Sequence, residues 1–504
     1  MSAAKVETGA AISDIAEALR AAGVLVSVPP VIPSRVTGIS DDSRAVSRGG
    51  LFVAVRGTTL DGHDFIGAAR EAGASVVLAE DAARAEGGAV IIVRDGRRAA
   101  AIAAAAFYGN PAAAMRVVAV TGTNGKTTTV GMIRHLLDEA DDAVARSASV
   151  GTLGVLFGSA GGPVDGGAGL TTPGPVELQR VLRELADRGA RSVAIEVSSH
   201  ALAQKRVEGV GFAAAVFTNL TRDHLDYHGT MAAYRDAKFA LAAHIAPTGV
   251  AVVNADDRNW DTLSGGARRV TFGNSPSADV HAEEISYLPR GTGFRLVTPQ
   301  GRADVHLPLI GDFNVSNALG AVAAAISLGV SLATVAARLA TMPQVPGRLE
   351  LVGERPSVLR DYAHTPDALE RSLKALRPFV PGRLIAVFGA GGDRDPGKRP
   401  LMGAVAARLA DIAIVTSDNP RTEDPESIID EIVAAMPAGG FERLEDRRAA
   451  IARAIAIADP ERDVVLLAGK GHETYQVRGT EKLPFDEAAI VAEILAPKRA
   501  EGAA

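Results

Sequence analysis

A glycine-rich segment with one lysine and two threonines has the clearest chemical meaning in the sequence. Residues 121–128 read Thr-Gly-Thr-Asn-Gly-Lys-Thr-Thr, after an apolar run and before residues with helical apolar spacing. Glycines let successive backbone N–H groups converge on phosphate oxygens, and a helix N-terminus favours an anion. Lys126 would reach the β- and γ-phosphates, and the hydroxyl of Thr127 would coordinate Mg²⁺. The segment therefore predicts a nucleotide-binding loop.

This segment departs from the longer phosphate-loop pattern G-x-x-x-x-G-K-[ST], because Val120 stands at its first glycine. The alternative is a glycine turn with a solvated lysine, but the order strand, glycine turn, helix favours nucleotide binding. The loop alone names no reaction, since kinases, motors and synthetases share it. The residues expected to contact ATP here are Gly122, Thr123, Asn124, Gly125, Lys126, Thr127 and Thr128.

Composition limits the classes of protein to consider. The chain has 504 residues, 47% of them hydrophobic, with a net charge of −6 and no cysteine. It is long enough for several cores, and it has no basic excess of the kind that binds nucleic acid. Without cysteine there are no disulfides or thiolate metal sites, and residues 1–19 lack a secretory signal. We expect a soluble cytoplasmic protein with no nucleic acid partner and no membrane insertion.

The chain is expected to contain three α/β regions that position the loop and its partners. Strands are predicted at residues 50–55, 75–78, 90–93, 116–120, 192–197, 214–218, 358–361, 384–388, 412–416 and 464–468. The expected boundaries are residues 1–112, 113–345 and 346–504, and a mainly parallel sheet is expected in the middle region. The glycine-rich stretch 158–169 is expected to be a mobile loop. In the last region the predicted strands run into polar residues, as in α/β domains that bind ligands at strand ends.

The nucleotide loop resembles that of the Mur ligases and their folylpolyglutamate synthetase relatives. Seven or more further motifs resemble the diaminopimelate-adding members of the Mur family in the same order, from Asp42-Ser43-Arg44 to Gly469-Lys470-Gly471-His472-Glu473. The resemblance implies an N-terminal uridine-binding domain, a central ATPase-type domain and a C-terminal Rossmann-like domain. It also implies the reaction: ATP phosphorylates a carboxylate of the substrate, and an amine then displaces phosphate to form an amide.

The same resemblance implies the metal site. Glu196 and His224 match the Mg²⁺ ligands, together with Thr127, and Lys238 matches a lysine that is carbamylated in the family. Carbamylation would turn a cation into an anion that helps to hold a second Mg²⁺. From the residues alone, a strand-end glutamate, a surface histidine and a solvated helical lysine are the ordinary alternatives.

Two further sets of residues match substrate and nucleotide contacts of the family. Those matching contacts to UDP-N-acetylmuramoyl-L-alanyl-D-glutamate are Ser43, Thr58, Thr59, Leu60, Thr171, Thr172, Ser198, Gln204 and Arg206. Those matching nucleotide contacts between domains are Asn314, Arg348, Asp361 and His364. Arg206 is physically suited to an anion because its guanidinium is a fork of donors. Taken singly, a surface hydroxyl carries little information, and the segment around Ser43 is also typical of a turn or a helix cap.

The identity of the added amino acid depends on Arg421. It closes the segment Asp418-Asn419-Pro420-Arg421, which resembles the diaminopimelate-specific signature of the family. Diaminopimelate carries a second carboxylate at its far end, and a guanidinium can bind that carboxylate through two hydrogen bonds. The alternative is a turn with a solvated arginine. The residues that match diaminopimelate contacts are Arg394, Asp418, Asn419, Pro420, Arg421, Gly469 and Glu473.

The resemblance thus implies a monomeric enzyme that uses ATP and Mg²⁺ to join meso-diaminopimelate to the D-glutamate carboxylate of its nucleotide-linked substrate. A sister ligase that adds L-lysine or L-ornithine is the nearest alternative. A folylpolyglutamate synthetase-like enzyme ranks lower, because the chain has a matching N-terminal region and the Asp-Asn-Pro-Arg segment. A non-catalytic nucleotide-dependent binding protein is the alternative from another class.

Overall fold

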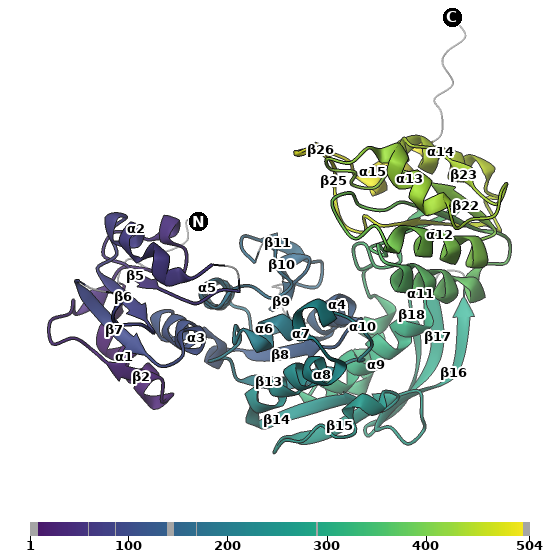
Figure 1. The fold of residues 1–504 in the computed structure, drawn as a ribbon. Helices are drawn as coiled ribbons and strands as arrows, with labels where there is room; N and C mark the ends of the chain where they lie inside the picture. The colour runs from purple at the N-terminus through teal and green to yellow at the C-terminus, as the bar shows by residue number, and fades with distance from the viewer. Residues whose placement is uncertain are drawn as a thin grey trace, which may run out of the picture. The chain divides into compact units, whose positions relative to one another are not determined.

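The structure, a computed structural model, describes residues 9–58, 60–85, 87–138, 146–167, 169–288 and 291–496 (Figure 1). It has the expected α/β architecture, built from separate sheets. Two compact units divide the chain: the first comprises Met1–His281, Thr298–Gly301 and Asn317–Val335, and the second comprises Ala282–Val297, Arg302–Ser316 and Ala336–Ala504. Within the described ranges, no helix has both the length and the apolar character needed to cross a bilayer.

The N-terminal part of the first unit is a small sheet covered by helices. In spatial order its strands are β2 (Leu25–Ser27), β7 (Ala89–Val93), β6 (Val76–Ala79), β5 (Leu51–Val53) and β4 (Ile39–Ser40). The strands β4 to β7 are parallel, and β2 is antiparallel to β7. Helices α1 (Ile12–Ala21), α2 (Ile66–Glu71) and α3 (Gly96–Phe107) accompany them. The predicted strands at 50–55, 75–78 and 90–93 are confirmed as β5, β6 and β7.

The second sheet of this unit holds the predicted nucleotide loop. Its spatial order begins with β11 (Gly162–Val164), β10 (Gly154–Phe157), β9 (Ser147–Gly151), β12 (Ser192–Glu196), β8 (Arg116–Thr121), β13 (Phe212–Phe217), β14 (Ile245–Asn254) and β15 (Arg268–Gly273). The strands from β9 to β15 in this order are mutually parallel, as predicted, whereas β10 is antiparallel to its neighbours. Strand β8 lies between two parallel neighbours, which explains its continuous apolar run.

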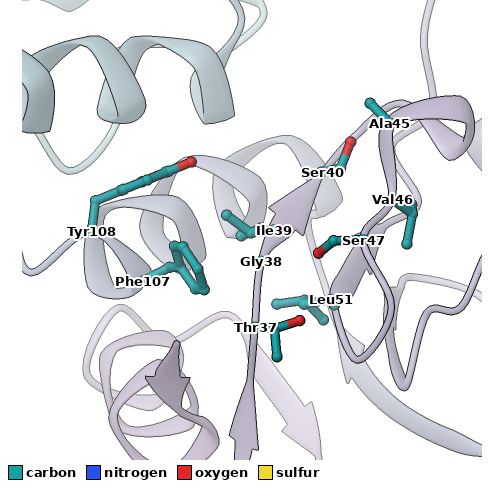
Figure 2. Close-up of a pocket in the computed structure, with 11 residues that line it drawn as sticks. Thr37, Gly38, Ile39, Ser40, Ala45, Val46, Ser47, Leu51, Phe107 and Tyr108 are labelled. Carbon is teal, nitrogen blue, oxygen red and sulfur yellow. The ribbon is translucent and has the colours of Figure 1, made fainter. Parts of the chain in front are cut away.

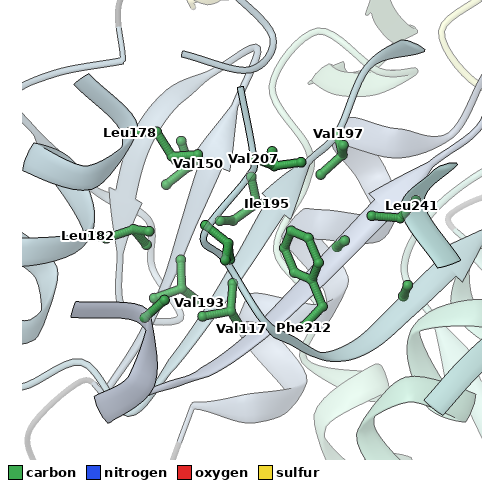
Figure 3. Close-up of a cluster of buried hydrophobic side chains, with 14 of the residues drawn as sticks. Val117, Val150, Leu178, Leu182, Val193, Ile195, Val197, Val207, Phe212 and Leu241 are labelled. Carbon is green, nitrogen blue, oxygen red and sulfur yellow. The ribbon is translucent and has the colours of Figure 1, made fainter. Parts of the chain in front are cut away.

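Helices pack on this sheet and bury its core. They include α4 (Lys126–Leu137), α5 (Pro175–Asp187), α6 (Ser199–Ala203) and α8 (Met231–Phe239), each of which has buried residues. The other helices of residues 113–345 are α7 (Leu225–His228), α9 (Asp312–Ser327) and α10 (Leu332–Ala340). Figure 3 shows the core cluster in which Leu178 and Leu182 of α5 face Val193 and Ile195 of β12. Phe212 of β13 belongs to the same cluster and is fully buried. This packing fixes the strand that carries the loop.

The second unit contains a sheet with a core on each face. Its strand order is β19 (Glu350–Glu354), β20 (Ser357–Asp361), β24 (Val464–Ala468), β21 (Leu384–Phe388), β22 (Ile412–Val415) and β23 (Glu442–Arg443). Apart from the antiparallel β19, neighbouring strands are parallel. Val358 and Leu359 alternate between the two core clusters, because successive strand residues point to opposite faces. The predicted strands of the last region are confirmed.

The remaining elements of the second unit lie around this sheet and beside it. Its helices are α11 (Pro366–Leu376), α12 (Lys398–Leu409), α13 (Pro425–Val433), α14 (Arg447–Ile457) and α15 (Glu487–Leu495). The strands β16 (Val280–Leu288), β17 (Gly291–Thr298) and β18 (Gly301–Leu307) neighbour one another, and β25 (Tyr475–Arg478) pairs with β26 (Glu481–Pro484) as a hairpin.

The expectation of a mobile loop over residues 158–169 is wrong for its first part. Strand β11 forms there and pairs antiparallel with β10, with Val155 opposite Val164. Gly158 and Gly161 take positive φ angles of 73° and 74° between the two strands. Their freedom in the left-handed region therefore makes a hairpin turn, and the glycine content that favoured a loop serves a regular element.

Phe212→Ala should destabilise the protein strongly, because it leaves a cavity in the core beneath the loop-bearing strand. We expect the free energy of unfolding of that region to fall by about 3–5 kcal/mol. Val31→Ala is the matched control, since Val31 is 85% exposed. Urea unfolding followed by tryptophan fluorescence measures both, because Trp260 belongs to the same cluster. Equal midpoints for the two variants would contradict this view of the core.

Candidate active site

The nucleotide loop joins β8 to α4 through a turn that only glycine can make. Gly122 has a φ of +149° and Gly125 a φ of +83°. A Cβ on Gly122 would lie 1.9 Å from Oγ1 of Thr218, and one on Gly125 would lie 2.3 Å from Oδ1 of Asn317. The loop backbone therefore packs closely on neighbouring side chains. It leads directly into the N-terminus of the twelve-residue helix α4, the end of a helix that favours an anion.

Two lysine side chains converge on one carbonyl of this loop. Lys126 donates from Nζ to the Gly122 carbonyl at 3.0 Å, and Lys238 of α8 donates to the same carbonyl at 2.8 Å. Lys238 is buried, and its ammonium lies 4.6 Å from the ring centre of Tyr234. Burial, followed by the nearby charge of Lys126, holds the pKa of Lys238 well below its usual value. An anion bound at this loop would relieve the repulsion between the two cations.

Glu196 ends β12 beside the loop, in the position predicted. The parallel register of β12 with β8 places it opposite Val120. The buried carboxylate accepts a hydrogen bond from Oγ1 of Thr127 at 3.1 Å. It also accepts from the backbone N–H of Thr152 at 2.8 Å and from Oγ1 of Thr152 at 3.2 Å. Thr152 could not be predicted as a partner of Glu196, because it follows a short strand without a motif of its own.

His224 lies in a small group of aromatic side chains that reaches the loop. It takes a left-handed φ of 52° at the start of α7, and its ring centre lies 4.8 Å from that of His200. Its ring also lies 6.1 Å from that of Tyr234, whose hydroxyl is 3.1 Å from Oγ1 of Thr123. Burial, then the neighbouring histidines, lowers the pKa of His200. Among the described residues, no three His, Cys, Asp or Glu side chains form a metal-binding group on their own.

The central residues predicted to contact the muramyl dipeptide form one network next to Glu196. Arg206 donates to the Thr172 carbonyl at 2.8 Å and to Oε1 of Gln204 at 2.7 Å. The hydroxyl of Thr172 donates to the Glu196 carbonyl at 2.7 Å and accepts from the N–H of Ser198 at 3.1 Å. Burial lowers the pKa of Arg206. Thr171 joins them through its hydroxyl, which is 3.4 Å from that of Thr152.

The predicted N-terminal contacts lie on loops after neighbouring parallel strands. Ser43 begins a short 3-10 helix, Ser43–Ala45, after β4, and Thr58 and Leu60 lie on an exposed loop after β5. The N–H of Gly57 donates to the Leu60 carbonyl at 2.9 Å and closes that loop. Thr59 lies outside the described residues. The predicted residues that are described therefore share one edge of this sheet.

A cavity of about 210 Å³ lies along β4 and the end of the 3-10 helix and was not anticipated from the sequence. Figure 2 shows the rings of Phe107 and Tyr108 on one side and the side chains of Ser40 and Ser47 on another. Ala45, the last residue of the 3-10 helix, also lines it. Burial raises the pKa of Tyr108. The cavity thus offers aromatic surface and hydroxyl groups next to the helix that begins at Ser43.

Three of the predicted nucleotide contacts of the second unit lie together at the end of β20. Asp361 accepts from the N–H of Leu349 at 2.8 Å and from Oγ of Ser372 at 3.0 Å, and its burial raises the pKa. The guanidinium of Arg348 lies 5.0 Å from the ring centre of Tyr362. Nδ1 of His364 lies 2.8 Å from the Tyr362 carbonyl.

Two further side chains of the second unit, those of Asn314 and Lys398, donate hydrogen bonds to backbone carbonyls. Asn314 lies in the first turn of α9, where its side-chain amide donates to the Ile310 carbonyl at 2.8 Å. Nζ of Lys398 donates to the His364 carbonyl at 2.9 Å. No motif in the sequence predicts this contact of Lys398.

The residues predicted to bind diaminopimelate meet at the ends of β22 and β24. A Cβ on Gly469, whose φ is +123°, would lie 2.9 Å from Oδ2 of Asp418. Asn419 donates from Nδ2 to Oε2 of Glu473 at 3.0 Å. Arg421, with a left-handed φ of 52°, donates from Nη1 to the Gly392 carbonyl at 2.6 Å.

A second arginine shares the loop that Arg421 contacts. A Cβ built on Gly391 would lie 3.0 Å from Nη1 of Arg421 and 3.9 Å from Cγ of Arg394. Two guanidinium-bearing side chains therefore border one loop, close to the Asp418-Asn419 segment that holds Glu473. The Pro420 carbonyl packs against Gly392, where a Cβ would lie 1.9 Å from it.

Comparison with known proteins relates all three regions to one family. The model for "Mur ligase family, catalytic domain" matches residues 35–114, "Mur ligase middle domain" matches 120–325, and "Mur ligase, glutamate ligase domain" matches 347–471.

Relatives named UDP-N-acetylmuramoyl-L-alanyl-D-glutamate–2,6-diaminopimelate ligase match most of the chain. The one from Geobacter metallireducens is 45% identical over 485 residues, covering 91% of this chain and 93% of that protein. The one from Synechococcus elongatus is 46% identical over 466 residues, covering 90% and 92%. A solved structure of a ligase with the same name is 34% identical, with a TM-score of 0.67, and covers 92% of this chain and 95% of its own.

Gly122→Ala should abolish nucleotide binding, because its Cβ would collide with Thr218 and displace the loop. Gly211→Ala is the control, since a Cβ there meets no atom within 4 Å. Calorimetric titration with a non-hydrolysable ATP analogue measures both affinities. Binding by the Gly122 variant at the affinity of the control would contradict the loop assignment.

Lys238→Met should raise the melting temperature at neutral pH. The pKa of Lys238 is lowered in the folded state, so the unfolded chain binds more protons and folding carries a penalty below the ordinary lysine pKa. Methionine removes that penalty, and the gain should shrink as the pH rises toward about 10. The Gly122 carbonyl keeps Lys126 as donor. Thermal unfolding in carbon dioxide-free buffer tests this; a lower melting temperature at neutral pH would contradict it.

Proposed function

The chain belongs to the Mur ligase family, and we propose that it joins meso-diaminopimelate to the D-glutamate carboxylate of UDP-N-acetylmuramoyl-L-alanyl-D-glutamate at the expense of ATP. The observation that carries the choice of amino acid is the pairing of charges in the second unit. Arg421 and Arg394 border one loop, while Glu473 is held nearby by Asn419. Guanidinium groups suit the far carboxylate of diaminopimelate, and a carboxylate suits its ammonium.

The chemistry requires an activated carboxylate, because a free carboxylate is a poor electrophile. In the proposed reaction a carboxylate oxygen of D-glutamate attacks the γ-phosphorus of ATP, and ADP leaves. The amine of the amino acid then bonds to the acyl carbon, and the C–O bond to phosphate breaks. Lys126 and the N-terminus of α4 would stabilise the charge on the transferred phosphoryl group. The position of Lys126 supports this role, since its Nζ lies 3.0 Å from the Gly122 carbonyl of the loop.

Magnesium fits the donor atoms around Glu196. Thr127 and Glu196 supply oxygen ligands 3.1 Å apart, and Mg²⁺ prefers oxygen and retains phosphate oxygens and water as further ligands. We propose that these two residues would hold the ion with His224, and that a bound ion would neutralise phosphate charge. Lys238 would join the ligands as a carbamate. Its lowered pKa supports this modification, because the neutral amine is the form that reacts with carbon dioxide.

Three domains would divide the substrates among them, with boundaries at residues 1–112, 113–345 and 346–504. The N-terminal domain would hold the uridine diphosphate through Ser43 and the loop after β5, and the adjacent cavity suits a flat base between hydroxyls and aromatic rings. The network of Arg206, Thr172 and Ser198 would hold the sugar and dipeptide beside Glu196. Asn314, Arg348 and Asp361 would contribute nucleotide contacts from the second unit. We further propose that the enzyme acts as a cytoplasmic monomer.

Each alternative function leaves a different feature of the structure unexplained. A ligase for L-lysine or L-ornithine would gain nothing from a guanidinium at the far end of its amino acid. A folylpolyglutamate synthetase-like activity leaves the N-terminal sheet and its cavity unexplained. A non-catalytic binding protein leaves Lys126, Glu196 and Lys238, which suit phosphoryl transfer, without a purpose.

Phosphate release tests the proposed function and the part played by Arg421. The enzyme receives ATP, Mg²⁺ and the UDP-muramoyl dipeptide, with meso-diaminopimelate, L-lysine or L-ornithine in parallel. We expect release with diaminopimelate alone and a tripeptide product by mass. In Arg421→Ala the KM for diaminopimelate should rise about 10- to 100-fold, the effect of losing hydrogen bonds to a charged group.

The control for this assay is Arg355→Ala, whose side chain is 70% exposed. It should leave every kinetic constant unchanged. Turnover with lysine or ornithine instead of diaminopimelate would refute the amino acid assignment. No release with any of the three would refute the ligase assignment itself.

A further inference from the structure

Lys470 is a buried cation beside the proposed amino acid site, and none of the contacts described so far uses it. It follows Gly469 at the end of β24, and its side chain is fully buried. Nζ donates to Oδ1 of Asn419 at 2.9 Å and to the Tyr475 carbonyl at 2.8 Å. It also lies 3.4 Å from Oδ1 of Asp418. A lysine side chain is rarely buried this completely unless its ammonium group is paired.

These contacts fix the orientation of the Asn419 carboxamide. Oδ1 of Asn419 accepts from Nζ of Lys470 and from the N–H of Val477, the latter at 2.9 Å. A flipped carboxamide would turn its NH₂ group toward these two donors, and both would lose their acceptor. The NH₂ group must therefore face the other way, where it donates to Oε2 of Glu473 at 3.0 Å.

The orientation matters because Glu473 carries the charge that would meet the substrate. A carboxylate on a loop has several rotamers, and one directed donor restricts it to the geometry that a ligand ammonium needs. Burial, opposed by the charges of Asp418 and Glu473, lowers the pKa of Lys470. Burying the Lys470 ammonium therefore costs free energy, and the carboxylates of Asp418 and Glu473 lie next to it.

We propose that Lys470 is a positioning residue of the amino acid site: by fixing the Asn419 carboxamide, it directs the Glu473 carboxylate toward the ammonium group of the incoming diamino acid. The identity of that amino acid rests on the proposed function. The opposing view is that Lys470 only ties the β25–β26 hairpin to the domain through the Tyr475 carbonyl, and the two views predict different kinetics.

A double-mutant cycle separates these views. The variants are Lys470→Met, Asn419→Ala and the pair together, and the measured constants are kcat and the KM for diaminopimelate and for ATP. Each single variant should raise the KM for diaminopimelate about 10- to 100-fold while the KM for ATP stays within about twofold. The double variant should be no worse than Asn419→Ala alone, because Lys470 acts through Asn419.

Two further variants keep the test decisive. Lys470→Gln retains a donor without the charge and should recover part of the loss, which also covers a failure of the methionine variant to fold. Lys482→Met removes an exposed lysine from the same hairpin and should change nothing. Effects that multiply in the double variant, or a lower melting temperature with an unchanged KM for diaminopimelate, would overturn the proposal.

A crystal structure of a Lys470 variant tests the positioning without turnover. We expect the Asn419 carboxamide to lose its single orientation and Glu473 to move out of hydrogen-bond range of Nδ2. An unchanged Asn419–Glu473 pair would overturn the proposal, whatever substrate the enzyme uses. If the wild-type enzyme fails to ligate diaminopimelate, the proposed function fails, and this structure still decides the role of Lys470.

Discussion

Everything at the central site depends on one electrostatic constraint, the convergence of Lys126 and Lys238 on the carbonyl of Gly122. Two cations do not share a buried acceptor at low cost, and burial, followed by the charge of Lys126, lowers the pKa of Lys238. The glycine turn brings that carbonyl into reach, and the packed sheet beneath holds the turn in place. The folded protein thus has a site suited to a polyphosphate. Glu196 lies beside this site, and hydrogen bonds from Thr127 and Thr152 fix its carboxylate.

The chemistry is arranged by the carboxyl ends of parallel strands in each sheet. Strands β8 and β12 deliver the loop and Glu196 in register, and β22 and β24 deliver Asp418 and Gly469. Parallel strands that end at the same edge bring residues together that are far apart in sequence. In our account, the first of these edges activates the carboxylate and the second presents the amine.

Much of this organisation could be read from the sequence, for identifiable reasons. Buried parallel strands are continuous apolar runs, so β8, β12 and β24 were predictable. The glycines around Lys126 indicated the nucleotide loop. The side chains that contact these elements were not predictable from the sequence. Thr152 binds a carboxylate 44 positions away and Lys470 an amide 51 positions away, and neither has a local pattern that encodes the contact. Strand β11 looked like a loop for a different reason: its pairing with β10 is a local hairpin, but glycines make the turn between the two strands.

The central claim is that a phosphoryl group passes from ATP to a carboxylate at the edge formed by Lys126 and Glu196. The most direct test labels the D-glutamate carboxylate of the UDP-muramoyl dipeptide with ¹⁸O and follows the released phosphate by ³¹P NMR. Our account predicts that one ¹⁸O atom appears in the phosphate for each amide formed, because the C–O bond of the acyl-phosphate breaks. Phosphate that carries no ¹⁸O while the tripeptide accumulates would contradict it.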